Sequence, residues 1–252
     1  MYQVRQEEVI CPVSGGALYG VLYLPEGGSA PLPLAVISHG LYSSYLMTAP
    51  TGEILAKHGV AAYCFDYRGC SFSNRSGGSM EECSILTEKE ELAAAVRHLG
   101  EREEIDASRI SLIGQSLGGV VAALLAAERP EDIHRLVLMY PAFHSEGYVR
   151  EMFPNPADIP DVVKNYMGIP GLHPGRKFFA DILKTPILDT IGEYKSPVLF
   201  LHGTADSMVP ERYVMEAAGR YRNCKYVTVE GGEHGFQIDE SLIDRVVKFL
   251  CE

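Results

Sequence analysis

The sequence predicts an α/β protein in which a mostly parallel sheet is covered by helices on both faces. Short apolar runs rich in β-branched residues alternate with helical patterns along most of the chain, as expected for strands buried between two helix layers. A glycine-flanked serine, Ser116, stands where one such run gives way to an apolar helix. The composition is that of a globular chain, since its 252 residues are 46% hydrophobic and 22% charged.

The chain opens with two extended segments, residues 3–13 and 17–24. Between them, Ser14-Gly15-Gly16 suits a tight turn, so the two segments predict an antiparallel hairpin. Six further apolar runs of strand length predict the buried strands of the sheet. These runs are residues 34–38, 60–66, 110–113, 136–140, 198–202 and 225–229.

Three segments between and after the strands predict helices. Thr87 and Glu90 form a capping-box pattern at the start of the first. Residues 117–128 are apolar nearly all round, as a helix buried against the sheet should be. In the third, Asp239 near the start and Lys248 near the end suit the helix dipole. The apolar faces of the first and third helices follow at helical spacing: Leu92, Val96 and Leu99, then Ile238, Leu242, Val246 and Leu250.

Residues 141–196 interrupt the alternation of predicted strands and helices. They hold seven of the 15 prolines, which favours short, irregular elements over another long strand–helix unit. We therefore expect a first core part of residues 1–140, a cap insertion of residues 141–196 that lies over the sheet, and a second core part of residues 197–252. Three aromatic residues of the insertion are candidates for substrate binding, unless they form the insertion's own core: Phe143, Tyr148 and Tyr166.

The charge balance excludes several partners. With 22 basic and 33 acidic residues, the chain carries a net charge of −11, which repels nucleic acid and anionic membrane surfaces alike. No run approaches the roughly 20 apolar residues that a membrane-spanning helix needs. Glu7 and Glu8 stand where a secretory signal would have its apolar stretch. We therefore expect a cytoplasmic protein with no nucleic-acid or membrane partner.

The six cysteines form no C-x-x-C pair. Scattered cysteines of this kind predict buried thiols in a reducing cytoplasm, and they lack the close ligand pairs of a zinc site. We accordingly expect neither a metal nor another cofactor. The six are Cys11, Cys64, Cys70, Cys83, Cys224 and Cys251.

The most specific motif is Gly114-Gln115-Ser116-Leu117-Gly118-Gly119. A turn from strand to helix this tight strains the serine backbone and leaves no room for side chains two positions to either side, so glycine is required there. The hydroxyl then projects above the sheet at a helix N-terminus, where free N–H groups favour a developing oxyanion. The motif in this context predicts a catalytic nucleophile, Ser116.

A serine nucleophile needs a base and an acid that orients the base. Asp206 follows the strand at 198–202, and His234 lies in a glycine-rich loop after the last strand. The order Ser, Asp, His along the chain is the one expected for such a turn, so we assign His234 as base and Asp206 as its partner. Glu230 and Glu233 are rivals for the acid role, although both are very close to His234 in sequence.

An oxyanion hole needs two N–H donors. The N–H of Leu117, the residue after the nucleophile, is the first candidate. Ser38-His39-Gly40-Leu41 ends a strand and enters the same crevice at the carboxyl ends of the strands, so the N–H of Leu41 is the second. His39 fits a supporting role better than a catalytic one, because its position before Gly40 suits a hydrogen bond that holds the loop.

Together these residues resemble the α/β-hydrolase family over essentially the whole chain. The resemblance rests on residues 38–41, on residues 114–119, on Asp206 and on His234. It implies the α/β-hydrolase fold, with a small cap insertion after the sixth strand. It also implies roles for five residues: Ser116 as nucleophile, His234 as base, Asp206 as its orienting acid, and the N–H groups of Leu41 and Leu117 as oxyanion donors.

Within this family, the compact size and the place of the insertion look like the bacterial cinnamoyl and feruloyl esterases. Those esterases hold the phenolic hydroxyl of the substrate with an acidic residue early in the insertion, whereas Tyr148 stands at about that place here. The family also includes acyl-peptidases, lipases, thioesterases and dehalogenases, and the fold does not choose among them. A dehalogenase needs an aspartate nucleophile, so Ser116 argues against that activity.

These observations predict a serine carboxylesterase that acts on a small-molecule ester through an acyl-enzyme, with cinnamoyl or feruloyl esters as one substrate class. A serine peptidase or aminoacyl hydrolase of the same fold, similar to prolyl oligopeptidase, is the first alternative, because acidic residues of the insertion are available to bind a substrate amine. A binding protein on an inactive hydrolase scaffold is the second, but no member of the triad is missing. The sequence leaves a homodimer open.

Overall fold

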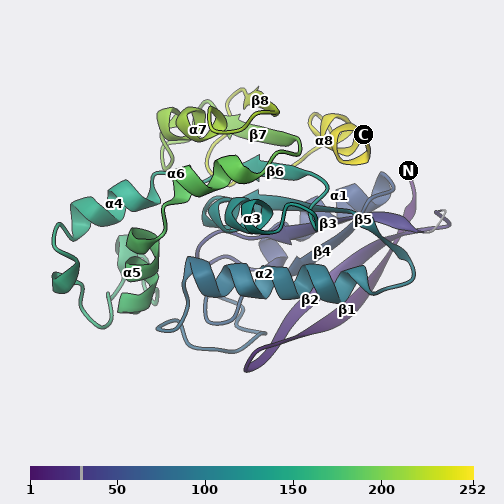
Figure 1. The fold of residues 1–252 in the computed structure, drawn as a ribbon. Helices are drawn as coiled ribbons and strands as arrows, with labels where there is room; N and C mark the ends of the chain where they lie inside the picture. Colours follow the sequence, from purple (N-terminus) through teal and green to yellow (C-terminus); the bar gives the residue numbers. More distant parts are fainter. Residues whose placement is uncertain (29–30) are drawn as a thin grey trace.

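The computed structural model describes residues 1–28 and 31–252, and these residues form one eight-stranded sheet flanked by helices (Figure 1). The strand order is β1-β2-β4-β3-β5-β6-β7-β8. The β1–β2 hairpin is antiparallel and pairs antiparallel with β4, and the remaining neighbours are all parallel. The strands are β1 Gln3–Val13, β2 Gly16–Glu26, β3 Leu32–Ser38, β4 Ala61–Phe65, β5 Ile105–Gln115, β6 Leu136–Met139, β7 Val198–Gly203 and β8 Cys224–Val229.

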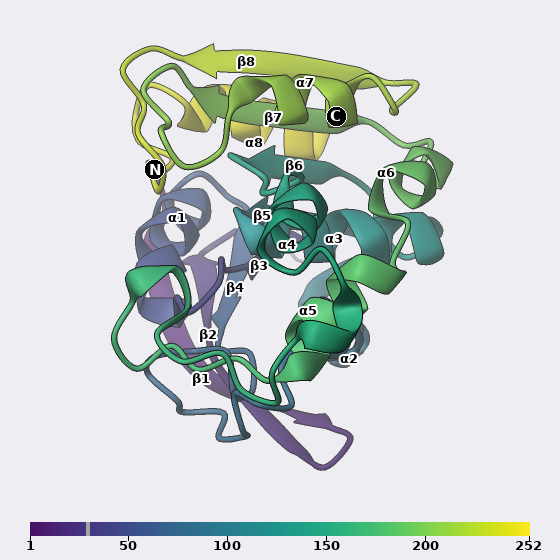
Figure 2. The same ribbon diagram turned by 90° about the vertical axis from the view of Figure 1, so that its left-hand side faces the viewer.

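Helices cover both faces of the sheet, as the sequence predicts. α1 and α8 pack on one face and share a core with it, whereas α2, α3 and α7 pack on the other (Figure 2). None of the helices in the described part of the chain has the length and apolar character that crossing a membrane requires. The helices of this layer structure are α1 Tyr45–Lys57, α2 Ile85–Gly100, α3 Leu117–Glu128, α7 Glu211–Ala218 and α8 Ile243–Cys251.

Two predicted helix starts are wrong. The capping box of α2 joins Ser84 and Thr87, not Thr87 and Glu90: the Ser84 hydroxyl accepts from Thr87 N–H, and the Thr87 hydroxyl accepts from Ser84 N–H. The last helix begins at Ile243 rather than near residue 238, because Asp239 Oδ1 accepts hydrogen bonds from the N–H and hydroxyl of Ser241 and forms a turn there.

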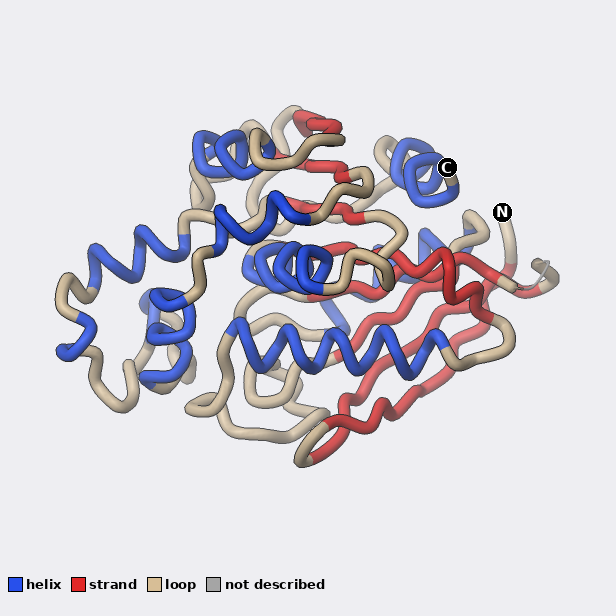
Figure 3. The backbone as a smooth tube through the Cα atoms, in the orientation of Figure 1, coloured by secondary structure: helices blue, strands red, loops and turns tan. Residues whose placement is uncertain are grey.

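Short elements occupy the chain between β6 and β7. The first of them lie beyond one end of the sheet, whereas the last two, residues 187–193, pack against α3 (Figures 1 and 3). Their own core contains Tyr166, Phe178 and Phe179, whose ring centroids lie 5.1–5.9 Å apart. This segment therefore has the short, irregular elements that its prolines predict. They are α4 Ser145–Met152, η1 Pro156–Asp158, η2 Tyr166–Gly168, α5 Arg176–Lys184, α6 Ile187–Thr190 and η3 Ile191–Glu193.

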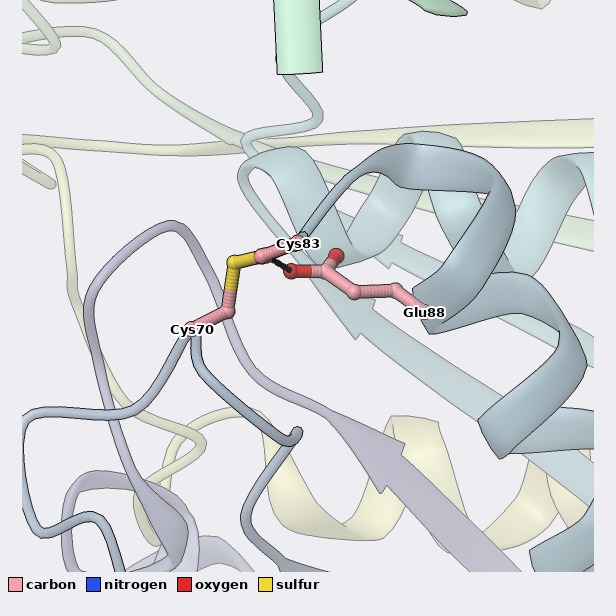
Figure 4. Close-up of side chains that lie close together, drawn as sticks. All are labelled: Cys70, Cys83 and Glu88. Carbon is pink, nitrogen blue, oxygen red and sulfur yellow. Dashed lines mark hydrogen bonds between the residues drawn. A yellow bond between two sulfur atoms is a disulfide. The ribbon is translucent and has the colours of Figure 1, made fainter. Parts of the chain in front are cut away.

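The prediction of six buried thiols is wrong. Cys70 and Cys83 form a disulfide within the loop between β4 and α2, and their Cα atoms lie 5.9 Å apart (Figure 4). Cys11 and Cys64 are buried free thiols, whereas Cys224 is half-buried and Cys251 is exposed. The thirteen-residue separation of the disulfide gives no recognisable sequence signal, because the fold of the loop brings the two residues together.

α2 carries two buried carboxyl groups, Glu88 and Glu91, and Glu88 lies beside this disulfide. Glu88 Oε1 is 3.5 Å from Cys83 Sγ, and burial raises the pKa of Glu88 well above its usual value (Figure 4). Burial likewise raises the pKa of Glu91 to about 7, even though Glu91 accepts a hydrogen bond from Arg68 N–H. Because the two sulfur atoms are bonded to each other, the cluster offers no free thiolate to a metal ion.

Glu91 should make the protein less stable as the pH rises. Its pKa is higher in the folded chain than its ordinary value of 4.5, so the folded state binds more protons between about pH 4.5 and 7. The free energy of unfolding should therefore fall across this window, by on the order of 3 kcal/mol. Glu91→Gln keeps an acceptor for Arg68 N–H and removes the titration. Urea unfolding at pH 5 and pH 8 should show a smaller loss for Glu91→Gln, and an equal loss in both proteins would contradict this assignment.

Candidate active site

Ser116 lies at the sharp turn between β5 and α3. Its backbone has φ 52° and ψ −120°, a conformation that non-glycine residues rarely adopt. β6 and the segment that follows it hold this conformation, because Ser116 N–H donates to Met139 O on β6 and Ser116 O accepts from Ala142 N–H, both at 3.0 Å. The strained turn exposes the Ser116 side chain above the sheet, as the sequence motif predicts.

The glycines around Ser116 are required by close packing. A Cβ atom on Gly114 would lie 2.6 Å from Gly118 O, and one on Gly118 would overlap the carbonyl oxygens of Ser38 and His39. A Cβ atom on Gly40 would lie 3.1 Å from Ser116 Cβ. The turn at Ser116 and the start of α3 therefore leave no space for a side chain at Gly114 or Gly118, and a side chain at Gly40 would require Ser116 to shift.

The structure brings Ser116, His234 and Asp206 together in a single hydrogen-bonded chain. Ser116 Oγ is 3.0 Å from His234 Nε2, and His234 Nδ1 is 3.0 Å from Asp206 Oδ2. The side chain of Asp206 is fully buried, whereas that of His234 is 16% exposed. A neutral imidazole with its proton on Nδ1 can donate to Asp206 and accept the serine proton on Nε2.

Asp206, rather than either rival glutamate, is the partner of His234. Its other oxygen, Oδ1, accepts from the N–H groups of Met208 and Val209, both at 2.9 Å, so the carboxylate is held in one orientation. Glu230 faces the Thr204 hydroxyl, and Glu233 is exposed. Neither glutamate has a hydrogen bond to His234 among the described residues.

The loops that carry Asp206 and His234 are tied to each other. They follow β7 and β8, which are parallel neighbours at the edge of the sheet. Thr204 N–H donates to Val229 O, and Ala205 N–H donates to Gly232 O, each at 3.0 Å. Gly231 N–H donates to the Thr204 hydroxyl at 2.8 Å. Strand pairing therefore continues into the loops and sets the distance between the acid and the base.

Tyr140 supports the His234 ring, and the sequence does not predict this role. The two ring centroids lie 4.8 Å apart in an edge-on arrangement, and Phe236 contacts Tyr140 from its other side at 4.9 Å. Tyr140 has a φ of 38° directly after β6, so strain is present here as well as at Ser116. A tyrosine between the last residue of a strand and Pro141 carries no motif that would identify it in advance.

His39 holds the loop that follows β3. Its Nδ1 lies 2.8 Å from Gly40 O, and its Nε2 accepts from Tyr67 N–H at 3.2 Å. Both ring nitrogens are thus used within the protein, and burial lowers the pKa of His39 so that the ring stays neutral. This geometry fits the supporting role that the sequence predicts.

The N–H groups of Leu41 and Leu117 are available to a ligand. Within residues 1–28 and 31–252, neither N–H donates to a protein acceptor. Both residues line the same cleft as Ser116 and His234. Leu117 is the first residue of α3, whose dipole adds positive potential at this point. Leu41 and Leu117 thus each bring a backbone N–H with no acceptor in the described structure to the cleft that holds Ser116.

The cleft above Ser116 has a volume of about 240 Å³ and lies between the insertion and the strand ends. Tyr148 and Tyr166 line it, as expected from the sequence. Phe143 does not: it is buried against Phe200 of β7, because its side chain points into the core below the insertion. His144, which the sequence does not single out for this cleft, lines it with a buried Nδ1 that has no hydrogen-bond partner in the described structure.

No Asp, Glu, Lys or Arg of the described residues lines the cleft. Three acidic residues of the insertion instead pair with neighbouring basic side chains outside the cleft. The closest pairs join Glu146 to Arg150, Asp161 to Arg176 and Asp181 to Lys177. Burial lowers the pKa of His144, so this ring also adds no positive charge at neutral pH. The lining of the cleft is therefore uncharged, and the nearest charged group that the mechanism uses is the Asp206 carboxylate behind His234.

The sheet topology, the strained serine turn and the Ser–His–Asp chain define the class of protein as an α/β-hydrolase. Residues 29–172 match the family described as serine aminopeptidase, S33, and residues 183–252 match the family described as TAP-like protein. The chain belongs to the α/β-hydrolase family that carries the first of these descriptions. The family and fold expected from the sequence are thus confirmed.

Relatives and solved structures extend this comparison. The chain is 30% identical over 178 residues to the α/β-hydrolase domain-containing protein WAV2 of Arabidopsis thaliana, covering 68% of this chain and 53% of that protein. It is 28% identical over 203 residues to the human acylamino-acid-releasing enzyme, covering 77% of this chain and 27% of that enzyme. The chain thus spans about half or less of the length of these relatives. Est1E from Butyrivibrio proteoclasticus, solved with ferulic acid bound, shares the fold with a TM-score of 0.85 at 23% identity, over 97% and 100% of the two chains.

Proposed function

We propose that this protein is a serine carboxylesterase that hydrolyses uncharged esters through an acyl-enzyme. The observation that carries the proposal is the chain from Ser116 through His234 to Asp206, with both contacts at 3.0 Å, at the floor of an uncharged cleft. A serine hydroxyl is a weak nucleophile until a neighbouring base accepts its proton, and this arrangement supplies that base.

The reaction follows from the geometry. Ser116 Oγ attacks the ester carbonyl while His234 Nε2 accepts the serine proton, and Asp206 stabilises the imidazolium that forms. The N–H groups of Leu41 and Leu117 bind the oxyanion. His234 then gives its proton to the departing alcohol, which leaves Ser116 acylated. A water molecule, activated by the same histidine, attacks the acyl-enzyme and releases the acid.

An ester suits this cleft better than a peptide amine. An aminopeptidase binds the positively charged amino terminus of its substrate, which calls for a carboxylate in the site. No carboxylate of the described residues lines this cleft, and Glu146, Asp161 and Asp181 of the insertion pair with basic residues outside it. The family description and the acylamino-acid-releasing enzyme relative favour the amide alternative, which therefore remains the second candidate function.

Cinnamoyl and feruloyl esters are a specific form of the proposal. Tyr148 and Tyr166 of the insertion, with ring centroids 6.3 Å apart, give the cleft an aromatic wall. The ferulic acid bound to Est1E, which has the same fold, is consistent with such a substrate. Since no carboxylate of residues 1–28 and 31–252 lines the cleft, a phenolic hydroxyl would have to bind a tyrosine hydroxyl or His144.

A matched kinetic comparison tests the proposed function. Methyl ferulate and short-chain nitrophenyl esters would be set against aminoacyl and prolyl nitroanilides, with wild type and Ser116→Ala protein. We expect the esters to be hydrolysed only when Ser116 is present and the nitroanilides to be inert. Serine-dependent cleavage of a nitroanilide would instead assign the protein to the peptidases. A preference for methyl ferulate over other esters would select the aromatic class.

A further inference from the structure

Exposed apolar side chains surround the opening of the cleft. Five of the residues that line it also expose a third to a half of their surface to solvent. Large apolar side chains in contact with water at a ligand site indicate that a ligand covers them when bound. We call these five the mouth residues: Met47, Tyr148, Met167, Ile169 and Met208.

A strained segment of the insertion presents two of the mouth residues. Asn165 and Met167 have φ values of 51° and 55°, which cost free energy for non-glycine residues. The segment is nevertheless held in place, because Tyr166 N–H donates to Leu172 O at 2.9 Å and Gly171 N–H donates to Asn165 Oδ1 at 3.3 Å. The fold thus maintains a strained backbone that keeps Met167 and the nearby Ile169 at the mouth rather than in the core.

The apolar surface continues from the mouth into the cleft. Phe178, Ile182 and Val209 line its interior and are almost fully buried. Ser116 lines the same cleft, so a substrate whose carbonyl is bound at Ser116 can extend over this surface. No charged side chain of the described residues interrupts the lining, which excludes a charged group along the path.

We propose that the cleft binds a flexible aliphatic chain of the ester substrate, which extends from the scissile carbonyl to the mouth residues. This inference rests on the proposed function and names the substrate class for the same site. Three of the five mouth residues are methionines, whose unbranched thioether chains adapt to ligands of variable shape. A rigid cinnamoyl group would bury less of this apolar surface than a flexible chain that can bend along it.

The proposed aliphatic chain belongs to a single substrate molecule rather than to a lipid in a bilayer. The net charge of −11 repels anionic membrane surfaces. The apolar surface also leads inward to Ser116 instead of forming a flat external patch. Monomeric esters in solution should therefore be hydrolysed faster as their aliphatic chain lengthens, without vesicles being present.

A chain-length series tests this inference. Nitrophenyl esters from acetate to decanoate vary the acyl chain, and acetates of ethanol to octanol vary the alcohol chain, all below their micellar concentrations. In one of the two series we expect kcat/KM to rise by up to about fourfold for each methylene that is buried, and then to level off when the chain passes the mouth. The series that shows the rise identifies the side of the ester that carries the chain.

Matched variants locate the binding surface. Met47→Gln and Met167→Gln keep nearly the same side-chain length and replace the thioether with an amide. Each should lower the ratio of kcat/KM for octanoate to kcat/KM for acetate, or the same ratio for octyl and ethyl acetate, by at least about fivefold. Met215 on α7 is exposed to the same extent as Met47, 51%, and does not line the cleft. Met215→Gln should leave the ratio unchanged, and because the ratio is internal to each protein, differences in folded fraction cancel.

The outcomes separate this inference from the proposed function. A flat chain-length series with serine-dependent hydrolysis of acetates would overturn the aliphatic chain and leave the esterase intact. A rising series that Met47→Gln and Met167→Gln affect no more than Met215→Gln would overturn the mouth residues as its binding surface. No hydrolysis of any ester would overturn both.

Discussion

Replacement of Ser116 by alanine should lower kcat for ester hydrolysis by on the order of 10⁴ or more. The Ser116 hydroxyl lies 3.0 Å from a ring nitrogen of His234. It lines the same cleft as Leu41 and Leu117, and no other hydroxyl of the described residues is hydrogen-bonded to His234. Without it, no covalent acyl-enzyme can form, and only oxyanion binding remains to accelerate attack by water.

Steady-state kinetics with a short-chain nitrophenyl ester measures this loss. Ser108→Ala is a suitable control, because Ser108 is an exposed residue near the opposite end of β5 and should retain the rate of the wild type. Ester turnover by Ser116→Ala within a few-fold of the wild-type rate would show that another residue performs the reaction.

Replacement of Asp206 by asparagine should also cost on the order of 10⁴ in kcat. The carbonyl oxygen of asparagine can take the place of Oδ1 and still accept the hydrogen bonds from the N–H groups of Met208 and Val209. The amide nitrogen then replaces Oδ2 opposite His234 Nδ1 and donates to it. The imidazole proton is thereby moved to Nε2, where it blocks acceptance of the serine proton. The loss should appear in kcat with little change in the stability of the protein to urea.

Glu230→Gln and Glu233→Gln are the matched controls for Asp206→Asn. Each removes one negative charge from the adjacent loop that carries His234 without altering a hydrogen bond to His234. Both variants should retain kcat within a few-fold of wild type. A large loss in either one, together with an active Asp206→Asn protein, would show that the acid has been assigned to the wrong residue.

Those features of the site that depend on local context can be predicted from the sequence. The strained turn at Ser116 requires Gly114 and Gly118, and these glycines are visible in the sequence. Asp206 and His234 each follow a recognisable apolar strand, and parallel strands bring their carboxyl ends to one edge of the sheet. Ser116, Asp206 and His234 can thus be predicted to lie close together because each follows an apolar strand of the same parallel sheet.

Features that depend on packing between distant segments could not be predicted in this way. The Cys70–Cys83 disulfide depends on the path of a loop, and the edge-on contact of Tyr140 with His234 depends on two loops that meet in space. Phe143 illustrates the same limit, since an aromatic residue of the insertion can point into the cleft or into the core with equal hydrophobic gain. Met47, on a helix before the nucleophile, likewise has no sequence feature that links it to the cleft.

The most direct test of the proposed chemistry is covalent labelling with a nitrophenyl alkylphosphonate, followed by mass spectrometry of the intact protein and its peptides. Such a reagent reacts with an activated serine and leaves a stable tetrahedral adduct that resembles the acyl-transfer intermediate. The expected result is one adduct per chain, on the peptide that contains Ser116, with none in Ser116→Ala and much slower labelling in Asp206→Asn. An adduct on a different residue, or an unlabelled protein that still hydrolyses esters, would contradict Ser116 as the nucleophile.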